Sequence, residues 1–143
     1  MRYVVDASVV AKALLREADS AVADALIESH RDGRCSLLAP EIIVAEVANA
    51  LWKRSHIRQQ ISADEARELL SDFLSLGLFL TPTSTLAGAA LQIATRESHS
   101  VYDCLYVALA ESAACPFVTA DEKLRAKLSA GGVPVLSLKS FVI

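Results

Sequence analysis

Short apolar runs rich in β-branched residues alternate along this chain with longer stretches of amphipathic character. The short runs predict strands, and they cover residues 3–5, 35–38, 78–80, 117–119 and 135–136. The longer stretches predict helices, and they cover residues 9–15, 20–30, 40–53, 62–76, 84–96, 100–114 and 121–128. Because strands that alternate with helices pair in parallel, we expect an α/β fold, a three-layer α/β/α sandwich with a mostly parallel central sheet.

Polar residues and one proline mark where several of these helices should begin. Ser8 is placed to cap the first helix, and Pro40 suits the first turn of the third. The segment Ser62–Glu65 has the pattern of a capping box, in which a hydroxyl and a carboxylate satisfy each other's backbone amides. The segment Ser100–Asp103 has a similar pattern, and it opens a very apolar helix.

Four acidic residues, Asp6, Glu46, Asp103 and Asp121, lie next to these apolar elements. Asp6 closes the first strand, and Asp121 follows the strand over 117–119. Ligand sites of parallel α/β sheets form beyond the carboxyl ends of the strands, so both should reach that edge. Asp103 falls in the first turn of one helix and Glu46 in the middle of another. The pattern predicts that the four converge on one site.

The chemistry of clustered carboxylates indicates what such a site binds. Carboxylates that share a partly dry pocket resist ionisation unless a cation neutralises them, and hard divalent metals prefer oxygen ligands. The sequence therefore predicts a metal-dependent nuclease. Ser8 and Thr119, each two residues from an acid of the set, could orient a carboxylate or a metal-bound water.

Each acid also has a simpler explanation when it is taken alone. Asp103 and Asp121 could only cap helices, and Glu46 could be paired with Lys53 or Arg54 on a helix surface. These explanations together describe a rival function, a non-catalytic interaction module that binds no metal.

Another rival is a receiver-type or phosphoryl-transfer domain, which has a similar α/β build and an acidic pocket. That class requires an adjacent acid pair after the first strand, whereas Asp6 is followed by Ala7 and Ser8. Other enzyme classes fit less well, because the chain has no G-x-S-x-G nucleophile motif, no Gly-rich phosphate loop and no H-E-x-x-H zinc motif.

Composition and charge refine this picture. The 143 residues suit a single domain over 1–143, and the hydrophobic content of 53% suggests that a second copy covers part of the surface, as in a homodimer. The formal net charge of −3 disfavours a simple nucleic-acid-binding module but not a nuclease, because bound metal restores positive charge locally.

The chain has three cysteines without paired spacing, no secretory signal and no long apolar run. These features predict a cytoplasmic protein.

Basic residues near the predicted site could hold a nucleic acid. Lys53, Arg54, His56 and Arg58 form the densest basic run, at the far end of the helix that carries Glu46. Lys12 and Arg16 lie one helical turn apart after Asp6. Either set could contact RNA phosphates, although a solvated helix face explains any single member better. We assign the aromatic pair Tyr102 and Tyr106, one turn apart, to packing.

Four segments of the chain, taken in order, resemble the PIN-domain nucleases, most closely the small VapC-type toxins of bacterial toxin–antitoxin pairs. The segments are Val-Val-Asp-Ala-Ser at 4–8, Pro-Glu-Ile-Ile-Val-Ala-Glu-Val-Ala-Asn at 40–49, Ser-Val-Tyr-Asp-Cys-Leu-Tyr at 100–106 and Phe-Val-Thr-Ala-Asp-Glu at 117–122. The family's acidic quartet then falls on Asp6, Glu46, Asp103 and Asp121, and its hydroxyl positions fall on Ser8 and Thr119.

The resemblance implies a Mg²⁺- or Mn²⁺-dependent endoribonuclease, PIN-like in fold, that acts as the toxin of such a pair and arrests translation when unopposed. It implies that the quartet holds the metal and that the products carry a 5′-phosphate and a 3′-hydroxyl. It also implies a homodimer, neutralised by a small VapB-like antitoxin whose tail lies across the active-site groove.

Overall fold

Five parallel strands form the central sheet in the computed structural model, which describes residues 1–128 and 132–142. The strands are β1 (Arg2–Val5), β2 (Ser36–Pro40), β3 (Phe79–Thr81), β4 (Phe117–Thr119) and β5 (Val135–Ser137). They are ordered β3-β2-β1-β4-β5, and every neighbouring pair is parallel. The predicted α/β class is confirmed.

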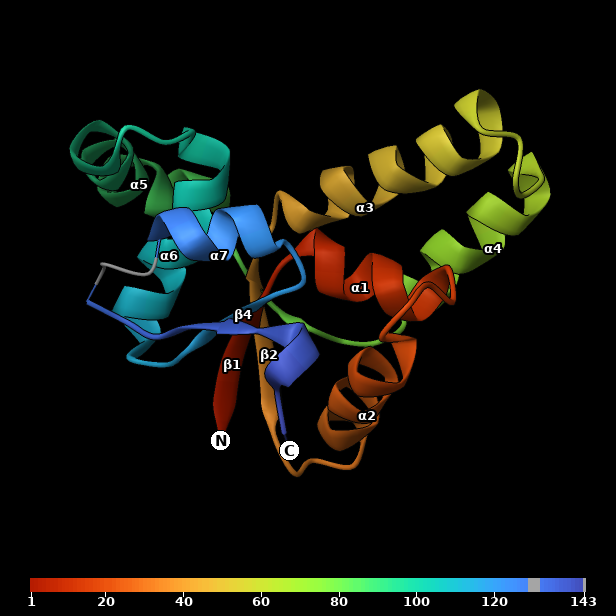
Figure 1. The fold of residues 1–143 in the computed structure, drawn as a ribbon, viewed down its shortest axis with the longest axis horizontal. Coiled ribbons are helices and arrows are strands. Elements are labelled where there is room, and N and C mark those ends of the chain that lie inside the picture. Colours follow the sequence, from red (N-terminus) through yellow and green to blue (C-terminus); the bar gives the residue numbers. More distant parts are fainter. Residues whose placement is uncertain (129–131, 143) are drawn as a thin grey trace.

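Helices cover both faces of this sheet (Figure 1). They are α1 (Ala7–Leu14), α2 (Ser20–Arg31), α3 (Ile43–Trp52), α4 (Ala63–Leu74), α5 (Thr83–Glu97), α6 (Val101–Ala113) and α7 (Glu122–Leu128). Figure 1 shows α1 and α2 on one side of the strands and α5 and α6 on the other, with α3 and α4 projecting as a hairpin. A π-helical turn over Lys53–Ile57 extends α3, and a 3-10 turn over Leu138–Ser140 follows β5.

The core is centred on β1 and β4, the two strands in the middle of the sheet. Val4, Val5, Phe117 and Val118 are completely buried, as expected for parallel strands that are covered on both faces. The seven successive residues from Cys104 to Ala110 on α6 are also buried, so the middle of this helix is enclosed on every side. Buried apolar contacts on this scale fix the ends of β1 and β4 side by side, with Val5 opposite Val118.

Two of the predicted helix starts are wrong. Asp6, rather than Ser8, caps α1, because its carboxylate accepts hydrogen bonds from the amides of Ser8 and Val9. Pro40 ends strand β2 opposite Thr81, and α3 begins only at Ile43. Proline lacks a backbone donor and is tolerated at a strand end as well as in a first helical turn, so the sequence pattern alone did not separate the two.

The other predicted boundaries lie within two residues of the observed ones. The capping box of Ser62 and Glu65 is present with both of its hydrogen bonds. Ser100 caps α6 by accepting the amide of Asp103. Among the described residues, no helix has both the length and the apolar character that a bilayer span requires.

Candidate active site

Asp6 lies at the carboxyl end of β1 and is almost completely buried, with 6% of its surface exposed. Both of its oxygens accept short hydrogen bonds. The Ser8 hydroxyl donates to Oδ1 at 2.5 Å, and the Thr119 hydroxyl donates to Oδ2 at 2.5 Å. The amides of Ser8 and Val9 donate to Oδ1 as well, at 3.1 and 3.3 Å. The carboxylate is therefore held rigidly and retains lone pairs for a further ligand.

The two hydroxyls also connect β1 to the turn that follows β4. Ser8 Oγ accepts the amide of Ala120 at 3.0 Å, and Thr119 Oγ1 accepts the amide of Asp121 at 3.1 Å. Each hydroxyl therefore accepts from backbone on one side and donates to Asp6 on the other. This arrangement matches the predicted role of Ser8 and Thr119 in orienting a carboxylate.

Glu46 reaches the site from α3 and is bound by a tyrosine that the sequence pattern assigned only to packing. The buried hydroxyl of Tyr106 donates to Glu46 Oε1 at 2.5 Å. The Tyr106 ring stacks on Phe117 of β4, with centroids 5.6 Å apart, which fixes the position of the hydroxyl. One signal was available in the sequence: Tyr106 is three residues after Asp103 on α6, so the two share a helix face.

Asp103 lies in the first turn of α6 and is partly buried. Its Oδ2 atom accepts the Ser100 hydroxyl at 3.1 Å. The same oxygen lies 3.1 Å from Nε2 of His99, a ring nitrogen that is buried and makes no hydrogen bond in this geometry. Asp103 is thus held by Ser100, the predicted start of its helix, and lies beside His99, which the sequence pattern did not single out.

Asp121 differs from the other three acids because it is exposed. Its Oδ1 accepts the amide of Leu124 at 3.1 Å in the first turn of α7. Its backbone amide donates to Thr119, whose hydroxyl in turn donates to Asp6. The structure therefore groups Asp6, Glu46 and Asp103 around Tyr106 and leaves Asp121 at the rim.

Burial and mutual repulsion shift the ionisation of this group. Burial, with a smaller contribution from Glu46, raises the pKa of Asp6 to about 6, although its hydrogen bonds to Ser8, Thr119 and Val9 oppose the shift. Burial and the nearby Asp103 likewise raise the pKa of Glu46, against the hydrogen bond from Tyr106. Burial first, and then the three carboxylates, raise the pKa of Tyr106, so its hydroxyl keeps its proton and acts as a donor.

The donor set fits a hard divalent cation in its chemistry. Carboxylate oxygens are the ligands that such ions prefer. A cation would offset the burial and the smaller mutual repulsion that raise the pKa values of Asp6 and Glu46. Among the residues that the structure describes, no three acidic, histidine or cysteine side chains are arranged so that they could hold a metal ion together. Glu46, Asp103 and Asp121 each accept a hydrogen bond from a donor of their own.

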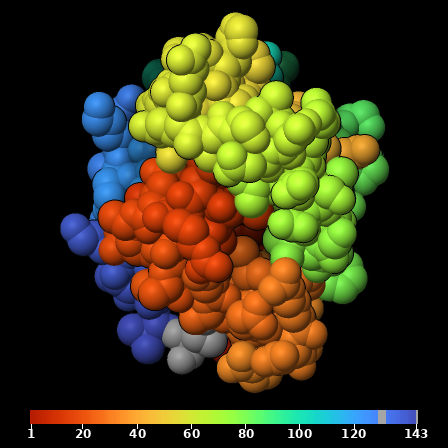
Figure 2. Space-filling view, turned by 90° about the vertical axis from the view of Figure 1, so that its right-hand side faces the viewer, coloured from red at the N-terminus to blue at the C-terminus, as the bar shows by residue number. Residues whose placement is uncertain are grey.

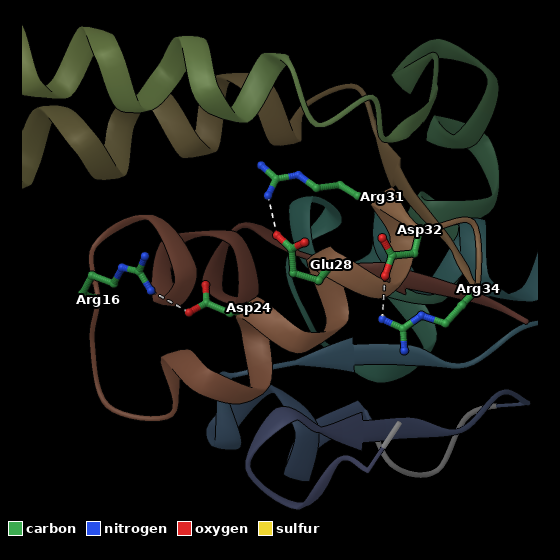
Figure 3. Close-up of polar contacts among 6 residues, drawn as sticks. All are labelled: Arg16, Asp24, Glu28, Arg31, Asp32 and Arg34. Atoms are coloured by element: carbon green, nitrogen blue, oxygen red, sulfur yellow. Dashed lines mark hydrogen bonds and ion pairs between the residues drawn. The ribbon is translucent and has the colours of Figure 1, made fainter.

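A separate cavity of about 500 Å³ lies between α1, α2 and α4, and none of the four acids lines it. It is the hollow between the red, orange and green segments in Figure 2. Its rim carries the ion pair of Arg16 with Asp24, at 2.7 Å, and that of Arg31 with Glu28 (Figure 3). Arg16, one of the predicted phosphate contacts, therefore lines this cavity and is neutralised by Asp24.

A family model of the PIN domain matches residues 3–127, a span that includes all four acids. The chain belongs to the PIN domain family. Ribonuclease VapC3 of Pyrobaculum aerophilum is 30% identical to this PIN domain over 132 residues, which cover 91% of this chain and 97% of that protein. The predicted resemblance to VapC-type PIN-domain nucleases is confirmed, and these ribonucleases generally depend on a divalent metal.

Solved structures support the same fold. The crystal structure of PAE2754 from Pyrobaculum aerophilum matches with a TM-score of 0.72 and 24% identity, and the match covers 98% of this chain and 85% of that one. VapBC2 from Rickettsia felis, solved with a DNA fragment from its promoter, matches with a TM-score of 0.66 and 15% identity over 96% of this chain and 98% of that one. At these identities the likeness concerns the three-layer architecture.

Proposed function

We propose that this PIN domain is a divalent-metal-dependent endoribonuclease and the toxin of a toxin–antitoxin pair. The observation that carries the proposal is the group of Asp6, Glu46 and Asp103 at the carboxyl edge of the sheet, where burial and mutual repulsion favour a bound cation. The relationship to a VapC ribonuclease over 91% of the chain supports RNA as the substrate.

Asp6, Glu46 and Asp103 would hold Mg²⁺ or Mn²⁺, and Asp121 would complete the set from the rim. When bound, such an ion supplies an acidified water for attack on the scissile phosphorus and neutralises charge on the leaving oxygen. The protein's own groups fix this site. Ser8 and Thr119 hold Asp6, and Tyr106 holds Glu46.

Proton transfer also falls to the carboxylates in this proposal. One member of the group would accept the proton of the attacking water as a general base. The products would carry a 5′-phosphate and a 3′-hydroxyl.

Removal of divalent metal tests this function. Cleavage of a single-stranded RNA is expected to fall by at least about 1000-fold in EDTA, because the metal contributes several kcal/mol to the transition state. Added Mg²⁺ or Mn²⁺ should restore the rate, and sequencing of the fragment ends would identify the products. Cleavage that proceeds equally fast in EDTA would contradict the proposal.

We further propose a small VapB-like antitoxin as the protein partner, with its tail across the active-site groove. A structural neighbour, VapBC2 of Rickettsia felis, is itself such a pair. The cavity between α1, α2 and α4, which lies apart from the four acids, would take another part of the antitoxin, because its lining joins the apolar Ala13, Ile27 and Leu76 to charged residues. That combination suits an amphipathic segment. If the product of an adjoining short reading frame failed to inhibit RNA cleavage, this partner would be excluded.

A homodimer in the cytoplasm completes the proposal. Large apolar side chains that remain exposed on the single chain include Leu74, Phe79, Leu91 and Tyr102. Exposed apolar surface of this kind is typical of a protein interface, and RNA as the substrate places the enzyme in the cytoplasm. Sedimentation velocity would contradict the dimer if it showed only monomer at micromolar concentration.

A further inference from the structure

We propose that a cleft between α1 and the end of α3 binds a backbone phosphate of the RNA, through Lys53 and Arg58. The inference rests on the proposed ribonuclease function and extends it, because it identifies a second place, apart from the carboxylates, where the protein binds the RNA strand. The cleft has a volume of about 240 Å³. Its lining consists of Ala11, Leu15, Glu17, Ala50, Lys53, Arg54 and Arg58.

Helical spacing connects this cleft to the active site. Ala50 and Lys53 follow Glu46 by four and seven residues, so all three lie on one face of the same helix. The rise of an α-helix places Lys53 about 10 Å beyond Glu46. On the opposite wall, Ala11 lies in α1, the helix that Asp6 caps. Both walls of the cleft therefore extend from the carboxylates. An RNA strand bound at the acids would reach the cleft within a few nucleotides.

The π-helical turn brings the two cations together. The backbone over Lys53–Ile57 is widened to a π-helix, and the amide of Arg58 donates to the carbonyl of Lys53 at 3.0 Å. This hydrogen bond spans five residues instead of four, so Arg58 closes the turn that Lys53 begins. Single π-helical turns are rare and occur frequently at functional sites. Here the turn has a direct consequence, since it places two positive side chains on one cleft.

The charges around the cleft leave these two cations free for an anion. Glu17, the carboxylate in the lining, is held by Arg54 at 3.2 Å. Lys53 and Arg58 form no ion pair with any residue in the described ranges 1–128 and 132–142. Arginine and lysine bind phosphate through charge-assisted hydrogen bonds. The small side chains of Ala11 and Ala50 leave room for the phosphate between the two helices.

Steady-state cleavage kinetics test the cleft. The double variant Lys53→Gln, Arg58→Gln is expected to raise KM for single-stranded RNA about tenfold near physiological salt, with the loss in KM rather than kcat. Removal of two phosphate contacts should also reduce the slope of log KM against log salt by about 1.4. The affinity for Mn²⁺, measured by calorimetry, should not change, because the metal ligands are untouched.

A matched control separates a local site from a general charge effect. The double variant Arg34→Gln, Lys139→Gln changes the net charge equally at exposed positions that do not line the cleft, and its KM should stay within about twofold of wild type. The proposal is overturned if the control raises KM as much as the cleft variant does. It is also overturned if KM responds instead to Lys123→Gln, Lys127→Gln on α7.

Two further outcomes are informative. If the cleft variant kept its KM but bound the antitoxin more weakly, the cleft would be a protein-binding site and the inference would be wrong. If wild-type protein cleaved no RNA, the proposed function would fail, and RNA binding by fluorescence anisotropy would then decide the inference separately. In that assay, equal affinity of wild type and the cleft variant for RNA would refute it.

Discussion

Replacement of Asp6 by asparagine is expected to lower RNA cleavage by at least about 1000-fold, because loss of one buried carboxylate removes several kcal/mol of metal-dependent stabilisation. Asn keeps the shape of the side chain. The Thr119 hydroxyl can rotate to accept from the new amide NH2, while Ser8 and the amide of Val9 keep donating to Oδ1, so the fold should persist. The rate of cleavage of a single-stranded RNA in Mg²⁺, compared with wild type, measures the effect.

Asp64→Asn is the matched control for this experiment. Asp64 is also an aspartate near the start of a helix, but it is exposed and contacts only Arg67 on the surface of α4. Its replacement should leave the cleavage rate within about twofold of wild type, as expected for a surface position. Comparable activity of Asp6→Asn and Asp64→Asn would show that the buried carboxylate has no part in catalysis.

The metal-free protein is expected to become more stable as the pH falls from about 7.5 to about 4.5. The pKa of Asp6 is about 6 in the folded state, against 3.8 for an ordinary aspartate. Between these values the folded protein holds a proton that the unfolded chain lacks, so acidification favours the folded state. Above pH 6 the side chain is ionised in both states and its burial costs roughly 3 kcal/mol. The raised pKa of Glu46 acts in the same direction.

Urea unfolding at several pH values, without metal, measures this effect. The difference in unfolding free energy between wild type and Asp6→Asn should change by roughly 2 kcal/mol across that range, with the wild type gaining relative to the variant as the pH falls. Saturating Mn²⁺ at about pH 7.5 should stabilise the wild type, because the ion binds only the folded state. If the difference in unfolding free energy between wild type and Asp6→Asn did not vary with pH, burial would not raise the pKa of Asp6.

The simpler explanations of the acids are partly correct, and they coexist with the proposed site. Asp121 caps a helix as that explanation predicts, and Asp103 lies beside the cap of its own helix. Asp6 caps a helix as well, which the sequence pattern did not predict. Capping uses only some of the lone pairs of a carboxylate, so it does not prevent metal binding. For Glu46 the simple explanation is wrong, because Arg54 pairs with Glu17 and Glu46 accepts from Tyr106 instead.

The parallel topology explains why part of the site was predictable. Short β-branched runs followed by Asp6 and by Thr119 indicate strand ends, and parallel strands bring their carboxyl ends to one edge. The observed hydrogen bond between Thr119 and Asp6 follows from that rule once β1 and β4 are neighbours. The positions of these strand ends could be predicted because the apolar pattern that marks a strand depends only on local sequence.

The contacts between helices were not predictable in the same way. The hydrogen bond of Tyr106 to Glu46 depends on how α6 and α3 are placed relative to each other, a result of packing across the whole core. The exposed position of Asp121 arises because its carboxylate binds the first turn of α7. The π-helical turn at Lys53 likewise has no propensity signal in its sequence, since the same residues suit an ordinary helix.

Calorimetric titration of Mn²⁺ into the metal-free protein at about pH 7.5 tests most directly whether the buried acids form a cation site. The account predicts saturable binding to the wild type, an affinity at least about 100-fold lower for Asp6→Asn and for Asp103→Asn, and no change for Asp64→Asn. Equal affinity in all four proteins, or no binding to the wild type, would contradict it.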